Sequence, residues 1–143
     1  MPKRIALKDG IEVDGTPLGN FARSIEFQSE HERRDVSGFN DTGASEFLAG
    51  QTTQAVTVEF FGSYGTGEVH QTVYPVHRDR EIVPFAWKPD NTAAVSATNP
   101  ELRGNVQALT YNPSAVRGQE EAFPVEFTAA DETGLVFYDV AAA

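Results

Sequence analysis

The chain has no cysteine. This absence excludes disulfide bonds, thiolate nucleophiles and zinc–thiolate sites together. Long apolar runs are missing as well, since no stretch approaches the roughly 18 apolar residues that a membrane-spanning helix needs. The basic start is followed by Asp9 and Gly10, so the apolar core of a secretion signal is absent. These features predict a protein that is made in the cytoplasm, does not enter a membrane, and leaves the cell only as part of a larger particle.

Motifs for catalysis and cofactor binding are also missing. The sequence contains neither a His-Glu-x-x-His zinc motif nor a Gly-x-Ser-x-Gly nucleophile elbow. The glycine-rich segment 62–67 lacks the lysine of a phosphate-binding loop and the spacing of a dinucleotide site. His70 and His77 are two helical turns apart, about 10 Å along the axis, which is too far to chelate one ion. We therefore expect no enzymatic activity, no cofactor and no metal site.

Positive charge is scarce and unevenly distributed. The chain has 11 Lys and Arg against 21 Asp and Glu, a formal net charge of −10. Binding to nucleic acid through phosphate neutralisation needs clustered cations, so the composition argues against it. The N-terminus is basic, whereas no Lys or Arg follows Arg117. One end of the chain could thus attract the other end of a neighbouring copy; the alternative is ordinary solvated surface.

The residues that are present favour a β protein. The chain has 143 residues, 40% of them hydrophobic, which suits one domain over 1–143 with a real core. Val69, Val73 and Val76 form a helical stripe and predict a helix over 68–77. The fold class is therefore mainly β, an antiparallel β-sandwich or barrel with one flanking helix. Alternation or apolar character predicts strands at 4–7, 10–13, 20–30, 51–61, 81–88, 93–97, 102–111, 122–128 and 135–140.

Two long strands, 20–30 and 51–61, enclose an irregular loop over about 31–50. We expect them to pair as a hairpin, each strand with one apolar face and one largely polar face. So long a loop is uncommon in a compact domain unless it serves a purpose, such as docking on the protein's own body or on another subunit. The polar face carries Ser24, Glu26, Gln28, Thr57 and Glu59.

Most of the chain resembles the major tail tube proteins of long-tailed, siphovirus-type bacteriophages. The resemblance rests on the order and character of several segments rather than on one motif. It implies a β-sandwich with a flanking helix, and subunits that form hexameric rings stacked into a hollow tube. The segments that carry it are Ser24–Phe39, Glu46–Gly50, Val56–Phe60, Glu68–His77, Trp87–Asp90, Ala97–Gly104, Tyr111–Pro113 and Phe123–Phe127.

The resemblance also implies where the residues act. Strands of six copies would join into one barrel around the lumen, and the five polar residues of the hairpin would face that lumen as an acidic lining that repels DNA. The long loop would contact the next ring, with Arg33 and Arg34 either pairing with acids there or remaining exposed charges of little energetic weight. The candidate loop contacts are Arg33, Arg34, Phe39, Phe47 and Leu48.

The expected partners follow from the same resemblance. They are other copies of the chain, further tail proteins such as the tape measure and the terminator, and DNA in transit during genome ejection rather than as a tight ligand. The protein would reside in the virion tail after assembly in the host cytoplasm. Two alternatives stay open: a head–tail joining or capsid-decorating protein, and a small β-sandwich binding module. In the second, Trp87 would supply a stacking surface instead of core packing.

Overall fold

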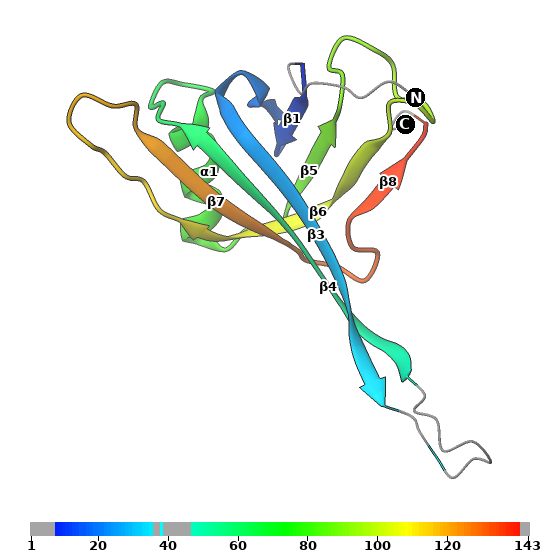
Figure 1. The fold of residues 1–143 in the computed structure, drawn as a ribbon. Coiled ribbons are helices and arrows are strands. Elements are labelled where there is room, and N and C mark those ends of the chain that lie inside the picture. Colours follow the sequence, from blue (N-terminus) through cyan, green and yellow to red (C-terminus); the bar gives the residue numbers. More distant parts are fainter. Residues whose placement is uncertain (1–7, 36–37, 39–46, 141–143) are drawn as a thin grey trace.

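The computed structural model describes residues 8–35, 38 and 47–140 and shows one curved antiparallel sheet with a helix against it (Figure 1). The prediction of a mainly β protein with one helix is confirmed. The strands are ordered β2-β1-β5-β6-β7-β4-β3, and β8 also pairs with β6. Within these residues no helix is long and apolar enough to cross a membrane. The elements are β1 (Gly10–Val13), β2 (Thr16–Pro17), the 3-10 turn η1 (Gly19–Phe21), β3 (Ala22–Asp35), β4 (Phe47–Phe61), α1 (Val69–Asp79), β5 (Val83–Lys88), β6 (Glu101–Tyr111), β7 (Ala122–Ala129) and β8 (Val136–Tyr138).

The core lies between the concave side of the sheet and α1. Alternate residues of the central strands point into it, and three phenylalanines, Phe60, Phe123 and Phe127, are fully buried. The helix contributes the predicted stripe of Val69, Val73 and Val76, all buried. The sheet curls far enough for the edge strand β3 to reach β8. There Phe27 meets Phe137 edge-to-face, with ring centroids 5.7 Å apart.

Most of the predicted strands are confirmed, and one is wrong. Residues 93–97 form turns instead of a strand, and only Ser96 makes an isolated bridge, to Asn99. The side chain of Asn99 is buried, and its amide donates to the carbonyls of Asp90, Ala93 and Ala94. These bonds satisfy the local backbone without a neighbouring strand. The predicted strand at 4–7 lies outside the described residues.

The loop expected over 31–50 is shorter than its sequence indicates. Strand β3 continues to Asp35 and β4 begins at Phe47, so residues 31–35 and 47–50 belong to strands. A register shift between His31 and Arg33 marks the place where the regular pattern stops. Beyond it both faces of the two-stranded ribbon meet water, so side chains there need not alternate in polarity. The ribbon extends away from the body (Figure 1).

Two neighbouring phenylalanines at the end of β4 test which face of this strand is turned toward the core. Phe60 is fully buried and Phe61 is 38% exposed. Replacing Phe60 with Ala should lower the free energy of unfolding by about 3–5 kcal/mol, because it leaves a cavity in a packed core. The control Phe61→Ala should cost less than about 1 kcal/mol. Urea denaturation measures both, and equal losses for the two variants would contradict the orientation of β4.

Candidate functional site

The five polar residues predicted on the hairpin lie together on one face of the sheet. In the register of β3 and β4, Ser24 lies opposite Glu59 and Glu26 lies opposite Thr57, and Gln28 is the next residue on the same side. The Gln28 amide donates to the Glu26 carboxylate at 3.1 Å. We call this surface, which points away from the core, the polar face.

The polar face extends across two further strands. Glu126 of β7 lies opposite Thr57 of β4 on one side and opposite Thr110 of β6 on the other. Thr110 accepts a hydrogen bond from the backbone N–H of Glu126 at 3.1 Å. The alternation of residues 122–128 already separates Glu126 from the apolar face of its strand. Its neighbours could not be read from the sequence, because the strand order β6-β7-β4-β3 depends on contacts between distant segments.

The charge of the polar face is predominantly negative. Four carboxylates stand on this face, and Arg23, beside the register shift in β3, lies 3.4 Å from Glu59. The side chains of Arg23 and Glu59 are 61% and 36% exposed, so solvent screens this ion pair and its energy is small. A surface of this kind repels phosphate groups that come within about a Debye length, roughly 8 Å at physiological salt. The carboxylates are those of Glu26, Glu30, Glu59 and Glu126.

The polar face ends at two different edges. Within the described residues, β3 pairs only with β4, so its outer edge has no strand partner. On the opposite side, β5 covers β6 only as far as Val106. Beyond that point α1 lies alongside, with His77 Nδ1 3.0 Å from the carbonyl oxygen of Ala108. An open edge strand offers unpaired N–H and C=O groups to another chain.

The predicted loop contacts fall on or near the part of the hairpin that leaves the body. We call its described residues, 29–35 and 47–53, the arm. Arg33 pairs with Ala49, and Arg34 with Leu48, which is 63% exposed. Arg34 also lies 3.4 Å from Glu32 on its own strand, an exposed ion pair of little energetic weight. Phe47 begins β4 opposite Asp35, and Phe39 lies outside the described residues.

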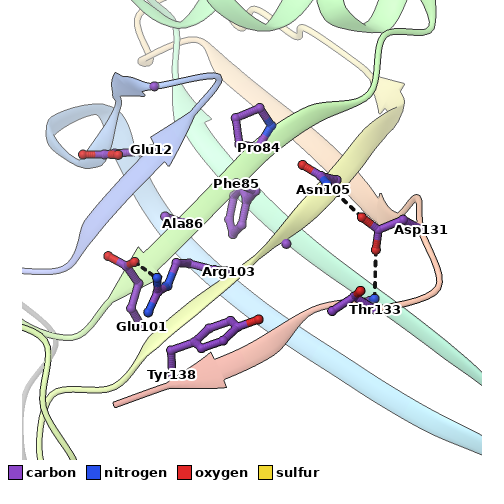
Figure 2. Close-up of a pocket in the computed structure, with 13 residues that line it drawn as sticks. Glu12, Pro84, Phe85, Ala86, Glu101, Arg103, Asn105, Asp131, Thr133 and Tyr138 are labelled. Atoms are coloured by element: carbon purple, nitrogen blue, oxygen red, sulfur yellow. Dashed lines mark hydrogen bonds and ion pairs between the residues drawn. The ribbon is translucent and has the colours of Figure 1, made fainter. Parts of the chain in front are cut away.

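A pocket of about 530 Å³ lies beside β5, β6 and β8 (Figure 2). Arg103 lies at 2.9 Å from Glu101 and stacks on the Tyr138 ring at 4.2 Å, and it also donates to the carbonyl of Val140. These contacts hold the last strand against β6. No cluster of three or more His, Cys, Asp or Glu in the described part of the chain could hold a metal ion.

Several solved structures with a similar fold come from virions and from their tails. The chain matches a protein of the native gene transfer agent virion with a TM-score of 0.74 and 13% identity, covering 95% of this chain and 99% of that one. It matches the tail of the empty gene transfer agent particle, refined with C6 symmetry, with a TM-score of 0.66 and 15% identity, covering 82% of each. It matches the SPP1 tail tube with a TM-score of 0.68 and 10% identity, covering 94% of this chain and 77% of that one.

The chain has a tail tube fold. Searches with protein-family models and against curated protein sequences find no match. At 10–15% identity the likeness concerns the tail tube fold itself, namely the path of the chain through the sheet and its helix. In this chain that fold displays an acidic polar face, an open β3 edge and a projecting arm.

The carboxyl group of Asp131, at the rim of the pocket, gives a test of the local geometry. The Asn105 amide at 2.7 Å, followed by the N–H groups of Gly134 and Thr133, lowers the pKa of Asp131 below its ordinary value. Because the folded pKa is lowered, the stabilisation is complete above pH of about 4 and is lost as the pH falls through the folded pKa. Asn105→Ala should move the Asp131 pKa upward in a carboxyl NMR titration, whereas Asn112→Ala should leave it in place. An unchanged pKa in Asn105→Ala would show that the amide does not hold this carboxylate.

Proposed function

We propose that this chain is the structural subunit of a tail tube, which assembles into hexameric rings stacked around a hollow lumen. The observation that carries the proposal is the shared fold, which spans 94% of the chain in the match to the SPP1 tail tube. The C6 symmetry of the gene transfer agent tail supports six copies per ring. The role is structural and not enzymatic, in agreement with the missing catalytic motifs.

The open β3 edge of the described sheet supports closure of the ring through strands. A four-stranded unit, β6-β7-β4-β3, has β3 unpaired on one side and a β6 edge lined by α1 on the other. In the ring, β3 of one copy would lie beside β6 of the next, so that the sheets of all copies form one barrel. Closure of a barrel removes exposed edges, which otherwise promote uncontrolled association.

The distribution of polarity supports the polar face as the side of that barrel that meets the lumen. The core and α1 cover the other face, so only the polar face can point inward without unpacking the subunit. Glu26 and Glu59 would then repeat around every ring, as would Glu126. A negative wall repels the DNA backbone, and repulsion lets the genome pass without sticking. DNA would thus pass through the lumen without being bound as a ligand.

The arm would connect successive rings. A two-stranded ribbon is marginally stable alone in water, and the described side chains of this one are mostly exposed. Contact with the adjacent ring would cover the Leu48 side chain and bring Arg33 and Arg34 close to acidic residues of that ring. The remaining partners are other tail proteins, such as the tape measure and the terminator. The virion tail is the site of action, and assembly takes place in the host cytoplasm.

A second candidate is a ring-forming component that does not stack into a tube. The six-fold symmetrised baseplate of the anti-feeding prophage contains a chain that matches with a TM-score of 0.61 and 10% identity, covering 99% of this chain. This match favours a baseplate or joining ring as the alternative. The two roles differ in what purified protein should form.

Electron microscopy of concentrated protein separates these roles. The tube proposal predicts hollow tubes of stacked six-fold rings. Deletion of residues 38–48, which include Leu48 of the arm, should leave the fold intact but abolish the tubes, because ring-to-ring contact is lost. Circular dichroism checks that the deletion variant is folded. Single rings from the parent chain would favour the second candidate, and normal tubes from the deletion variant would contradict the role of the arm.

Charge reversal tests the acidic lumen. Tubes that carry Glu26→Lys together with Glu126→Lys should retain double-stranded DNA at low salt and release it as salt rises, because cations along the wall attract phosphates. Glu120→Lys with Glu121→Lys, just before β7 and outside the polar face, is the control with the same net charge. DNA retention can be measured by co-sedimentation with the tubes. Equal retention by both variants would place Glu26 and Glu126 away from the lumen.

A further inference from the structure

The base of the arm is held by a glutamine side chain that binds backbone like an additional strand. Gln54 is the last residue of β4 that pairs with β3 alone, since the pairing of β4 with β7 starts at Ala55. The Gln54 amide oxygen accepts the N–H of Leu135 at 2.8 Å, and the amide nitrogen donates to the carbonyl of the same residue at 3.0 Å. One side chain thus makes both hydrogen bonds that a paired strand residue would make.

The backbone of Gln54 is tied to the body as well. Thr128 of β7 donates its hydroxyl to the Gln54 carbonyl at 3.3 Å. The Gln54 amide also lies 3.4 Å from the hydroxyl of Ser29, the facing residue of β3. Both strands of the arm are therefore joined to β7 and to the 131–135 turn at one level of the hairpin.

The turn that receives Gln54 is shaped for this contact. Gly134 has φ +69°, and a Cβ added there would lie 2.2 Å from the Gln54 amide oxygen, so only glycine allows the approach. Asp131 fixes the turn by accepting the amide of Asn105 at 2.7 Å (Figure 2). It also accepts the N–H of Gly134 at 3.0 Å. The contacts thus run from β6 through the turn to the base of the arm.

Beyond this level the described residues of the arm extend away from the packed core. Phe27, which touches Phe137 of β8, lies on the body side of Gln54. The arm residues from Ser29 to Asp35 are exposed, and so are those from Leu48 to Thr53 apart from the partly covered Gly50. A twisted two-stranded ribbon has low resistance to bending unless its base is clamped.

We propose that Gln54 is a positioning residue, which with the 131–135 turn forms a brace that sets the direction in which the arm leaves the body. The brace operates within one chain and is independent of the proposed function. Its importance for stacking rings rests on that function, because an arm must point at its receptor before contact is made.

The brace can be tested by measuring the orientation of the arm directly. The chain has no cysteine, so spin labels can be placed at Leu48→Cys on the arm and Ile82→Cys on the body, both exposed in the parent. Labelled full-length chain is diluted with unlabelled chain, so that pulsed electron spin resonance reports distances within one copy. In the parent background the distance distribution should be narrow.

The variants test whether the hydrogen bonds of the Gln54 amide, rather than the bulk of its side chain, hold the arm in place. Gln54→Leu keeps the bulk but loses both bonds to Leu135, and should broaden the distribution by about twofold or more, as expected when a local clamp is lost. Gly134→Ala should do the same, because its Cβ would displace the amide. Gln28→Ala is the matched control, since this glutamine faces Ala55 on the same hairpin and bonds only to Glu26.

The outcomes of this experiment are distinct. Broadening in Gln54→Leu and Gly134→Ala with a narrow distribution in Gln28→Ala supports the brace. A narrow distribution in Gln54→Leu, or equal broadening in all three variants, overturns it. Because the distances are intramolecular, they give this answer whether or not the protein forms tubes, so failure of the proposed function and failure of the brace are told apart. A variant is scored only if its circular dichroism matches that of the parent.

Discussion

The pairing of β4 with strands on both sides is the constraint on which the other features depend. Toward the core, β4 places Val56, Val58 and Phe60 against β7 and α1. Because side chains alternate along a strand, the same segment must place Thr57 and Glu59 on the opposite side. Burial of one face of β4 therefore determines which of its residues lie on the polar face. A slip of one residue would bury the acids and expose the core, so the register is strongly determined.

β4 also extends beyond the body of the protein. β4 continues past its last partner on β7 and keeps β3 as its only neighbour, so the arm is an extension of the core hairpin and not an added loop. The chain thus combines a stable body with an exposed ribbon and, among the described strands, an open edge along β3. Both expose backbone or side chains that another copy could cover, which is why assembly accounts for them better than solvation alone.

The sequence predicts features that depend on local interactions and misses those that depend on contacts between distant segments. The polar residues of the hairpin were found because a period of two is local to each strand. The partners of Glu126 were missed, because its neighbours Thr57 and Thr110 come from strands 69 and 16 residues away in sequence and only the sheet order brings them together. The strand predicted at 93–97 failed because the buried Asn99 amide captures three carbonyls there. The arm was read as a loop because exposure of both its faces removes the alternation that marks a strand. Gln54 gave no signal, since its role depends on Leu135.

The Gln54 amide at the base of the arm is important because a small rotation there displaces the far end of the arm by several ångströms. Seven residues separate Gln54 from Phe47, and at about 3.3 Å per residue the strand extends roughly 23 Å beyond the brace. A pivot of about 15° at the base would displace the far end by about 6 Å, which is more than the roughly 4.8 Å between neighbouring strands. An error of that size moves every contact at the tip to the wrong partner. Stiffness of the ribbon cannot prevent it, because the rotation occurs below the ribbon. Only bonds at the base can do so, and the Gln54 amide makes two of them to a turn that the body itself holds in place.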